Sequence, residues 1–468
     1  MTDKSIQDQM RSEIADKGLF EQAKASAFSY MDDVAARRVY PDTQAIRDLD
    51  RFEEPLPEGP QPGSEILNRL HSYGAPATVA QTGGRYFGFV NGGIIPTALA
   101  ARWISDTWDQ NPALYVISPI VSKLEQVVES WLRELLGLPA ETVAGYLGGS
   151  SLATFSGLAA ARYHILTRLG WDVNSRGLFG APEVRVVVSE QAHGAVFKAL
   201  ALLGLGKDRI ERVPADAQGR IIAAAIPQLD SRTILVLQAG NVNTGAFDAF
   251  EEICMEATRA KAWVHVDGAF GLWAAASNGR RYLTRGIERA DSWALDAHKT
   301  LNSPYDCGIV LCRHPDSLVA AMQARGDYIH YSEQRDGMLF VPDMSRRARA
   351  VELWATLRYL GKSGAEQLVD GLCERATQFA EGLSHEGFRV LNDVVFNQVL
   401  VACGTPARTQ ATLAQIQDGG VCWCGGTVWA GEPAIRVSVS SWATTAEDVD
   451  LCVGEFVKAR AATGREHK

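Results

Sequence analysis

Short apolar runs alternate with helical patterns between residues 181 and 313 of the chain. Each run has the length of one strand and is too short to form a helix of ordinary size. Continuous apolar strands between helices are typical of a mostly parallel sheet that helices cover on both faces. The pattern therefore predicts an α/β fold. The expected strands cover residues 184–189, 209–213, 233–237, 263–266, 292–295 and 309–312.

The two ends of the chain follow other patterns. Residues 14–50 have helical spacing with a moderately apolar face, and a proline-rich connector follows at residues 53–63. From residue 364 onward a helix is expected over 365–386, and short strands follow it. The expected C-terminal strands lie near residues 389–391, 398–402, 423–429 and 434–440. We therefore predict an N-terminal helical segment (1–80), a large α/β domain (81–350) and a small C-terminal α+β domain (351–468).

Composition narrows the class of protein. With 468 residues and 46% hydrophobic content, the chain can bury one large core or several smaller ones. The net charge of −9 argues against a nucleic acid partner. The polar N-terminus and the absence of any apolar run of about 18 residues predict a cytoplasmic protein without a membrane span.

The eight cysteines are scattered, and several stand in apolar runs, which predicts reduced, buried thiols and no disulfide frame. Cys422 and Cys424 have the spacing of half a metal site. No second pair of ligands stands at a matching spacing, so no metal is expected.

Polar side chains follow three of the apolar runs. Asp267 ends the run at 263–266, Lys299 closes a turn after the run at 292–295, and His193 follows the run at 184–189. The carboxyl ends of parallel strands share one edge, where open α/β sheets bind their ligands. An acid and a lysine there could hold the two ends of one pyridine ring, which is what pyridoxal phosphate requires. For Lys299 alone, a solvated turn residue is the plain alternative.

A glycine- and serine-rich stretch at residues 145–151 leads into an alanine-rich helix. Free backbone N–H groups at a helix N-terminus bind anions, and the hydroxyl groups of Ser150 and Ser151 add donors. This pattern alone is weak, but beside Asp267 and Lys299 it suggests a phosphate site. A dinucleotide-binding fold is disfavoured because no Gly-x-Gly-x-x-Gly follows any of the strands.

The segments His265-Val-Asp-Gly-Ala269 and Asp296-Ala-His-Lys299 resemble the group II pyridoxal phosphate-dependent amino acid decarboxylases. This family has the fold type I architecture and includes aromatic amino acid and glutamate decarboxylases. The resemblance extends from about Gly84 to Trp442 and is nearest to a bacterial branch. Two positions depart from the family pattern: Leu152 replaces a common glutamate, and Asn241 replaces a threonine.

The resemblance implies roles for particular residues. Lys299 would attach the cofactor covalently, Asp267 would pair with the ring nitrogen, and His193 would stack on the ring, which favours decarboxylation over transamination. For His193 alone, an ordinary helix-capping or core residue is the alternative. His298 would contact the phosphate. The other implied cofactor contacts are Ser150, Ser151, Asn241 and Ala269. Asn243 and Thr244 would either contact Asp267 or the substrate or satisfy turn backbone.

Substrate contacts are expected from three further segments. Tyr86 and Phe87 stand in an aromatic, glycine-rich stretch that either lines the substrate pocket or forms a corner of the core. Arg436 lies on a strand and needs an anionic partner, which is either the substrate carboxylate or an internal acid. In the resembled family a mobile loop carries a tyrosine that protonates the reaction intermediate in the partner subunit's site. Tyr331 is the candidate here, and Tyr328 is the second choice.

These observations predict an enzyme that decarboxylates an L-amino acid to its amine and CO2, and the aromatic stretch favours an aromatic substrate. The alternatives are another reaction on the same scaffold, namely oxidative deamination to an aldehyde, transamination or C–C cleavage, and a cofactor-binding relative without turnover. The resemblance also implies a homodimer with shared active sites, in which the N-terminal segment packs across the partner. A flexible N-terminal extension is the alternative.

Overall fold

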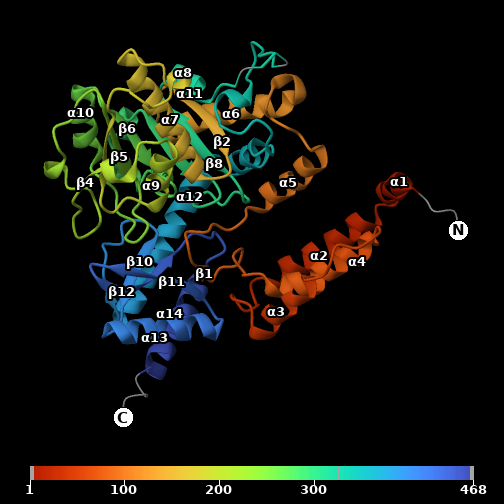
Figure 1. Ribbon diagram of the computed structural model, residues 1–468. Coiled ribbons are helices and arrows are strands. Elements are labelled where there is room, and N and C mark those ends of the chain that lie inside the picture. The colour runs from red at the N-terminus through yellow and green to blue at the C-terminus, as the bar shows by residue number, and fades with distance from the viewer. Residues whose placement is uncertain (1–4, 325, 328, 464–468) are drawn as a thin grey trace.

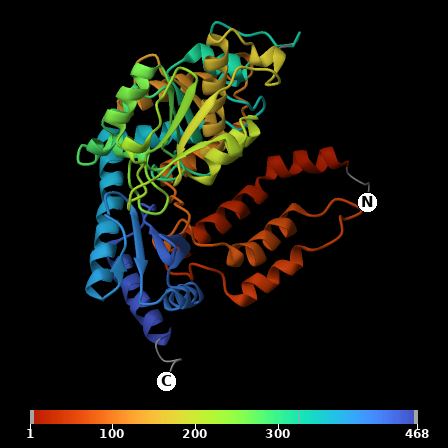
Figure 2. The same ribbon diagram turned by 60° about the vertical axis from the view of Figure 1, so that its left-hand side comes forward.

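The computed structural model describes residues 5–324, 326–327 and 329–463. Two β-sheets and the helices around them form the body, and a helical arm made by the N-terminal residues extends to one side of it (Figures 1 and 2). The chain enters from this arm, builds the larger sheet, and ends in the smaller one.

The larger sheet has seven strands in the order β2-β8-β7-β6-β5-β3-β4. Strands β3 to β7 run parallel, while β8 is antiparallel to both of its neighbours, β7 and β2. The prediction of a mostly parallel sheet is therefore confirmed. The strands are β2 (Val143–Leu147), β3 (Arg185–Ser189), β4 (Glu211–Val213), β5 (Thr233–Gln238), β6 (Trp263–Asp267), β7 (Ser292–Asp296) and β8 (Gly308–Cys312).

Helices cover both faces of this sheet, as its uniformly apolar strands require. Along β5, Leu235 and Leu237 point into the core on one face, and Ile234 and Val236 point into the core on the other. Helices α7, α9 and α11 cover the second face, and α6, α10 and α12 cover the first. Their bounds are α6 (Pro119–Leu136), α7 (Ser150–Arg168), α8 (Val173–Arg176), α9 (Gly194–Leu202), α10 (Phe250–Ala260), α11 (Pro315–Met322) and α12 (Ala350–His385).

The smaller sheet has the order β1-β11-β12-β10-β9. Its first strand, β1 (Tyr86–Phe87), comes from the start of the predicted large domain and pairs in parallel with β11 (Trp423–Trp429). The sequence assigns this aromatic segment to the large domain, but its strand lies in the smaller sheet. Its strand partner is more than three hundred residues later in the chain. The remaining elements are β9 (Arg389–Val390), β10 (Gln398–Ala402), β12 (Glu432–Ser438), α13 (Pro406–Gly419) and α14 (Ala446–Thr463).

Helix α12 connects the two sheets. The sequence predicts a helix from residue 365, but α12 begins at Ala350 and contacts α5 (Pro96–Trp108) and α6 before it reaches α14. Gly361, with φ of 59°, interrupts its helical geometry between these two parts. The border that the sequence places at residue 350 thus coincides with the start of this helix, which contacts elements of both predicted domains.

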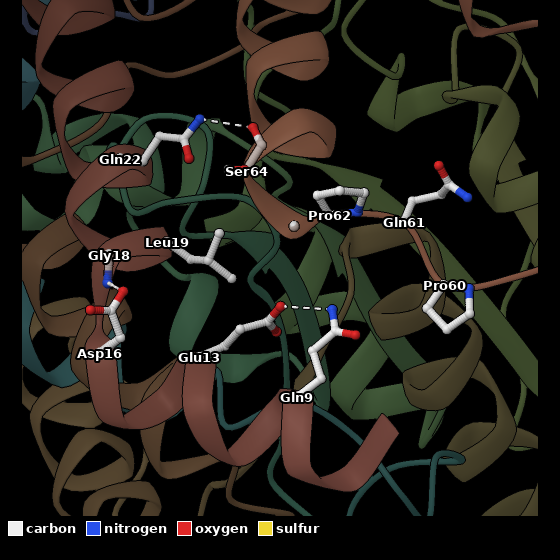
Figure 3. A pocket seen from close by; sticks show the side chains of 11 residues that line it. Gln9, Glu13, Asp16, Gly18, Leu19, Gln22, Pro60, Gln61, Pro62 and Ser64 are labelled. Atoms are coloured by element: carbon white, nitrogen blue, oxygen red, sulfur yellow. Dashed lines mark hydrogen bonds between the residues drawn. The ribbon is translucent and has the colours of Figure 1, made fainter. Parts of the chain in front are cut away.

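The arm consists of α1 (Ile6–Asp16), α2 (Gly18–Asp33), α3 (Thr43–Arg47) and α4 (Gly63–Arg69). The sequence predicts one helical stretch over 14–50, but the left-handed backbone of Lys17 (φ 61°) separates α1 from α2. Neither α1 nor α2 has a buried residue. A hollow of about 500 Å³ lies between these helices and the start of α4. Figure 3 shows side chains that line it, among them Glu13, Leu19 and Gln22.

Two further expectations from the sequence concern the cysteines and membrane-spanning helices. All eight cysteines are free thiols and are buried, as the sequence predicts. Across residues 5–324, 326–327 and 329–463, none of the helices combines the length and the apolar character needed to cross a membrane.

Candidate active site

The predicted acid and lysine lie at the same edge of the large sheet. Asp267 is the last residue of β6 and pairs in register with Ala294 of β7, and Lys299 follows the end of β7 by three residues. Asp267 is 6% exposed. Burial raises the pKa of Asp267, and the positive charges of His193 and Lys299 counteract this rise. The fold therefore brings all three predicted residues close enough to interact electrostatically.

The turn that carries Lys299 is held by residues from distant segments. Asn302, in left-handed backbone geometry (φ 56°), accepts hydrogen bonds from the Gly93 N–H (2.8 Å) and the Trp442 N–H (2.9 Å). A Cβ atom at Gly92 would overlap the carbonyl oxygen of Lys299, so only glycine fits there. Asn302 is not among the residues that the sequence indicates, because nothing local distinguishes it from any other turn asparagine.

Helix α7 begins beside this turn. Its N-cap is Gly149, which has no side chain to accept the free N–H groups of the first turn. Asp296, the last residue of β7, accepts both the Ser150 N–H (2.6 Å) and the Ser150 hydroxyl (2.7 Å). The same carboxylate lies 3.0 Å from Lys299 Nζ. Ser151, the second predicted donor, is exposed, and so is Leu152 (39%), which means that its apolar side chain interrupts no buried polar network.

His298 lies between the lysine and the helix N-terminus. Its Nδ1 atom lies 3.1 Å from both the N–H group and the carbonyl oxygen of Cys307, and its Nε2 atom lies 3.8 Å from Asp296 Oδ2. Burial lowers the pKa of His298, so the ring is neutral. The ring also stacks on Tyr305 at a centroid distance of 4.2 Å, and the Tyr305 hydroxyl donates to Asn91 Oδ1 (2.9 Å). Sequence reasoning missed Tyr305, since it follows a proline in a turn without a motif of its own.

Polar side chains in the loop after β5 form hydrogen bonds with backbone groups. Asn241 is 1% exposed, and its Oδ1 atom accepts the N–H groups of Asn243 (2.9 Å) and Thr244 (3.2 Å). The Thr244 hydroxyl donates to the Gln218 carbonyl (2.6 Å). Of the two interpretations that the sequence left open for Asn243 and Thr244, these bonds correspond to the one in which they satisfy the turn. Ala269 donates its N–H to Asp267 Oδ1 at 3.3 Å and so lies against the buried acid.

Arg436 lies on β12 and faces the same edge. It is 9% exposed, and its one hydrogen bond with a described acceptor goes from Nη1 to the Val242 carbonyl (3.2 Å). Its Nε atom is buried without a partner in the part of the chain that the structure describes. Burial lowers the pKa of Arg436, and no carboxylate among the described residues counteracts this. The internal acid that the sequence offered as one possible partner is therefore not found there.

Aromatic side chains lie next to this guanidinium. The rings of Tyr86 and Trp423 stack at 5.3 Å with 13° between their planes, and Phe89 stacks on the same indole at 5.7 Å. Burial raises the pKa of Tyr86 to about 12, and the charge of Arg436 acts against this rise. Phe87 is fully buried and packs edge-to-face on Phe379 (5.2 Å), so the interpretation as a core residue describes its position.

Tyr331 lies in the segment between α11 and α12, and its hydroxyl donates to the Ala324 carbonyl within the same segment (2.7 Å). Arg335 anchors the middle of this segment through buried ion pairs with Glu125 (2.9 Å) and Glu129 (2.7 Å). Within the chain the Tyr331 hydroxyl is therefore not directed at Lys299, and its predicted role in a partner's site stays a prediction. Tyr328, the second choice, lies outside the described residues.

These features fit pyridoxal phosphate. The cofactor needs an acid at its ring nitrogen, an amine at its aldehyde and an anion site at its phosphate. Asp267 is a buried acid, Lys299 is an amine at the same sheet edge, and the α7 N-terminus lacks a cap from its own N-cap residue. His193, at the N-terminus of α9, interacts electrostatically with Asp267. The chemistry of this donor set thus matches every part of the cofactor.

Comparison with known proteins gives the same picture. An aromatic-L-amino-acid decarboxylase from Bacillus atrophaeus is 26% identical over 333 residues, which are 68% of this chain and 67% of that protein. A cysteine sulfinic acid decarboxylase from Homo sapiens is 28% identical, over 67% of this chain and 66% of that protein. The chain thus aligns with about two thirds of the length of these relatives.

Among solved structures, Oryza sativa TDC with PLP and tryptamine superposes with a TM-score of 0.88 at 21% identity, covering 99% of both chains. This likeness establishes the common fold over the whole chain. Residues 47–402 match the family described as the pyridoxal-dependent decarboxylase conserved domain. The match includes Asp267, Asp296 and Lys299, and the chain therefore belongs to the pyridoxal phosphate-dependent decarboxylase family.

Proposed function

We propose that this protein decarboxylates an L-amino acid with an aromatic side chain and releases the amine and CO2. One observation supports the proposal most directly: a buried guanidinium, Arg436, has no carboxylate partner among the described residues and interacts electrostatically with Tyr86, whose ring stacks on Trp423. An aromatic amino acid has a carboxylate that can pair with the guanidinium and a flat apolar side chain that can pack on the rings.

Bound pyridoxal phosphate would supply an electron sink for the electrons left when CO2 departs. Asp267 would hold a proton on the ring nitrogen, because an ionised carboxylate buried at 6% exposure favours a positive partner. Lys299 would provide the amine that attaches the cofactor and gives way to the substrate. His193 would pack on the ring from the α9 side, and Ser150, Ser151 and His298 would face the phosphate, with Asn241 and Ala269 supporting the loops around the ring.

Arg436 would orient the substrate. Its unpaired Nε–H group is a donor whose burial is unfavourable until an acceptor arrives. Trp423 lies directly over Gly88, where a Cβ atom would overlap the indole, so the glycine lets the end of strand β1, which carries Tyr86, pack closely on this ring. The arrangement therefore favours a planar side chain over a compact charged one.

A second outcome has one specific observation in its favour. The Tyr331 hydroxyl is bonded to Ala324 in its own segment, so a proton for the substrate carbon must come from a rearranged loop or from another group. If that protonation is slow, the same site would release an aldehyde by oxidative deamination, with dissolved O2 as the two-electron oxidant and CO2, NH3 and H2O2 as the other products. The scaffold is also compatible with transamination, with C–C cleavage and with a binding role without turnover, because a fold does not fix the reaction.

The arm suggests a homodimer. Helices α1 and α2 bury none of their residues, yet they expose large apolar side chains that a monomer would leave in water. The exposed set on these helices comprises Ile6, Met10, Ile14, Phe20, Phe28 and Met31. A second copy of the chain that packs on this arm would cover them, and the segment with Tyr331 could then serve the neighbouring site.

A panel of L-amino acids tests the proposal. The purified protein should show the visible absorbance band of attached pyridoxal phosphate and release CO2 and amine from an aromatic amino acid. Lys299→Ala should lose both the band and the activity. Tyr331→Phe should shift the product from amine toward aldehyde. Turnover of acidic amino acids alone would overturn the aromatic assignment, and keto acid or aldehyde without amine from the unchanged protein would overturn decarboxylation to the amine.

A further inference from the structure

Asp296 connects the two parts of the site that would hold opposite ends of the cofactor. Its Oδ1 atom accepts the Ser150 N–H (2.6 Å), and its Oδ2 atom accepts the Ser150 hydroxyl (2.7 Å) and lies 3.0 Å from Lys299 Nζ. The residue is 2% exposed. One buried carboxylate therefore occupies donors at the phosphate end while it pairs with the amine at the aldehyde end.

The position of Asp296 follows from the start of α7. A helix N-terminus attracts negative charge because its first N–H groups lack partners and its dipole is positive there. Gly149 cannot cap the helix with a side chain, and a Cβ at Gly308 of β8 would overlap its backbone, so this glycine loop packs tightly on the sheet. Asp296 reaches this N-terminus from β7 and supplies the missing anion.

A phosphate group at the same N-terminus needs the same donors. Ser150 has one N–H hydrogen and one hydroxyl hydrogen, and each forms one good hydrogen bond at a time. A phosphate that takes them must displace the Asp296 carboxylate, and two anions then lie at one helix end. Lys299 and His298, 3.0 Å and 3.8 Å from Asp296, counteract this repulsion only in part, since His298 is neutral.

We propose that Asp296 is a positioning residue that competes with the cofactor phosphate for the N-terminus of α7, and thereby limits how tightly the phosphate is held. This inference rests on the proposed function, because it requires pyridoxal phosphate at this site. Its consequence is an enzyme whose cofactor is more readily exchanged than the number of phosphate donors alone would suggest.

A capping role alone would also explain the hydrogen bonds of Asp296, but it predicts a different result. Asp296→Asn keeps the side-chain size and an oxygen that accepts the Ser150 N–H, and it removes the charge. If Asp296 only caps the helix, the variant should hold the phosphate equally well or less well. If it competes with the phosphate, the variant should hold the phosphate more tightly.

The experiment titrates the wild-type protein and Asp296→Asn with pyridoxal phosphate and with pyridoxal, and follows the visible absorbance. The ratio of the two Kd values isolates the contribution of the phosphate to binding. Both ligands react with Lys299, so the loss of the Lys299–Asp296 ion pair affects both Kd values equally and cancels in the ratio. We expect the ratio to move at least about ten-fold in favour of pyridoxal phosphate, as expected for removing a like charge within one or two hydrogen-bond lengths. An unchanged ratio, or one that moves the other way, overturns the inference.

Asp172→Asn is the matched control. Asp172 also caps a helix, α8, by accepting the N–H groups of Asn174 (3.0 Å) and Ser175 (3.3 Å), and its replacement removes the same charge. The ratio should not move in this variant. A shift equal to that of Asp296→Asn would mean that net charge alone is responsible, and would overturn the inference.

Two serine variants test the same idea without altering Asp296. In the wild-type protein the Ser150 hydroxyl would bond to Asp296 before the phosphate binds and to the phosphate afterwards. Ser150→Ala should therefore change the ratio of the two Kd values less than three-fold. Ser151→Ala removes an exposed hydroxyl that has no carboxylate partner among the residues that the structure describes, and it should reduce the phosphate contribution more. The reverse order overturns the inference. If the wild-type protein binds neither ligand, the proposed function fails as well; if it binds the cofactor and only these shifts are absent, the role of Asp296 alone is wrong.

Discussion

At the scale of single residues, Arg436 has the features of a binding group rather than of a structural ion pair. A buried guanidinium without a partner destabilises the folded protein, because it has lost its hydration without gaining a counter-charge. Its Nε atom is unpaired among the described residues, and the Tyr86 phenol is the group whose charge opposes the lowering of its pKa by burial. Such a residue is expected where the missing partner is a ligand.

Arg436→Leu should therefore separate binding from stability. We expect KM for the substrate to rise by about 30-fold or more, since truncating one partner of a buried charge pair costs about 2–5 kcal/mol. The melting temperature should stay the same or rise, because an unpaired buried charge is removed. Steady-state kinetics and thermal denaturation measure the two effects. A loss of stability with unchanged KM would show that Arg436 serves the fold.

At the scale of elements, the fit between α7 and β6 depends on one glycine. A Cβ atom at Gly157 would lie 2.7 Å from Cε1 of His265, whose ring is fixed by a hydrogen bond to the Ser292 hydroxyl (2.8 Å). Burial lowers the pKa of His265 to about 3, so the ring packs as a neutral group. The glycine thus sets how closely α7, and with it the anion site at its N-terminus, approaches the sheet.

Gly157→Ala should lower the free energy of unfolding by about 1–3 kcal/mol, the usual effect of forcing a methyl group into a packed interface. Gly454→Ala in α14 is the matched control, because nothing lies within 4 Å of its added Cβ. That variant should raise stability by up to about 1 kcal/mol, since alanine favours helix more than glycine does. Urea denaturation compares the two. Equal effects would refute the packing argument.

The turn between β7 and β8 is tied to the start of α12 by Asp306. This carboxylate bonds to Arg347 (2.8 Å) and Arg349 (3.0 Å). Burial raises the pKa of Asp306, but the hydrogen bonds and charges of Arg349 and Arg347 outweigh it and lower the pKa from 3.8 to about 2. A lowered carboxyl pKa stabilises the fold above the unfolded value and loses this effect as pH falls through the folded value.

The stability difference between the wild-type protein and Asp306→Asn should therefore depend on pH. It should be constant above about pH 5 and shrink as pH falls from about 4 to 2. Thermal denaturation over this pH range measures it. A difference that is independent of pH below about 4 would mean that the carboxylate contributes through its shape and not through its charge.

At the scale of the whole molecule, the N-terminal arm lacks a hydrophobic core within the single chain. Ile14 and Phe20 are 65% and 60% exposed on helices that bury nothing. Helices shorter than about 12–15 residues are marginal in water without packing, and α1 has 11 residues. We therefore expect the arm to be stabilised by a second subunit.

Replacing Ile14 and Phe20 together by glutamate should weaken the dimer by at least about 100-fold in Kd, because both would place a charge in a buried apolar contact. Light scattering after size exclusion measures the mass, and activity should fall with dimer content if the sites are shared. Phe179→Glu is the control: this residue is 97% exposed on the body of the molecule and should leave the dimer intact. A monomeric wild-type protein with full activity would refute the shared site.

Local patterns determined much of this protein. The apolar runs predicted six of the seven described strands of the large sheet within one or two residues, but they missed β2, whose end falls in the glycine- and serine-rich stretch. The polar residues at the ends of these runs indicated Asp267, Lys299 and His193. The glycine- and serine-rich stretch indicated the start of α7. These features are readable because strand length, burial on both faces and helix capping are all set by neighbouring residues.

The tertiary structure alone decided the remaining features. It placed β1 in the second sheet, joined Asp296 to Ser150, locked the lysine turn through Asn302, and left Arg436 without a carboxylate among the described residues. Each of these features depends on contacts between segments more than a hundred residues apart. These segments come into contact only when the two sheets have formed and packed. Local propensity carries no information about such contacts, because the same asparagine or arginine would fit many turns and strands equally well until its distant neighbours are in place.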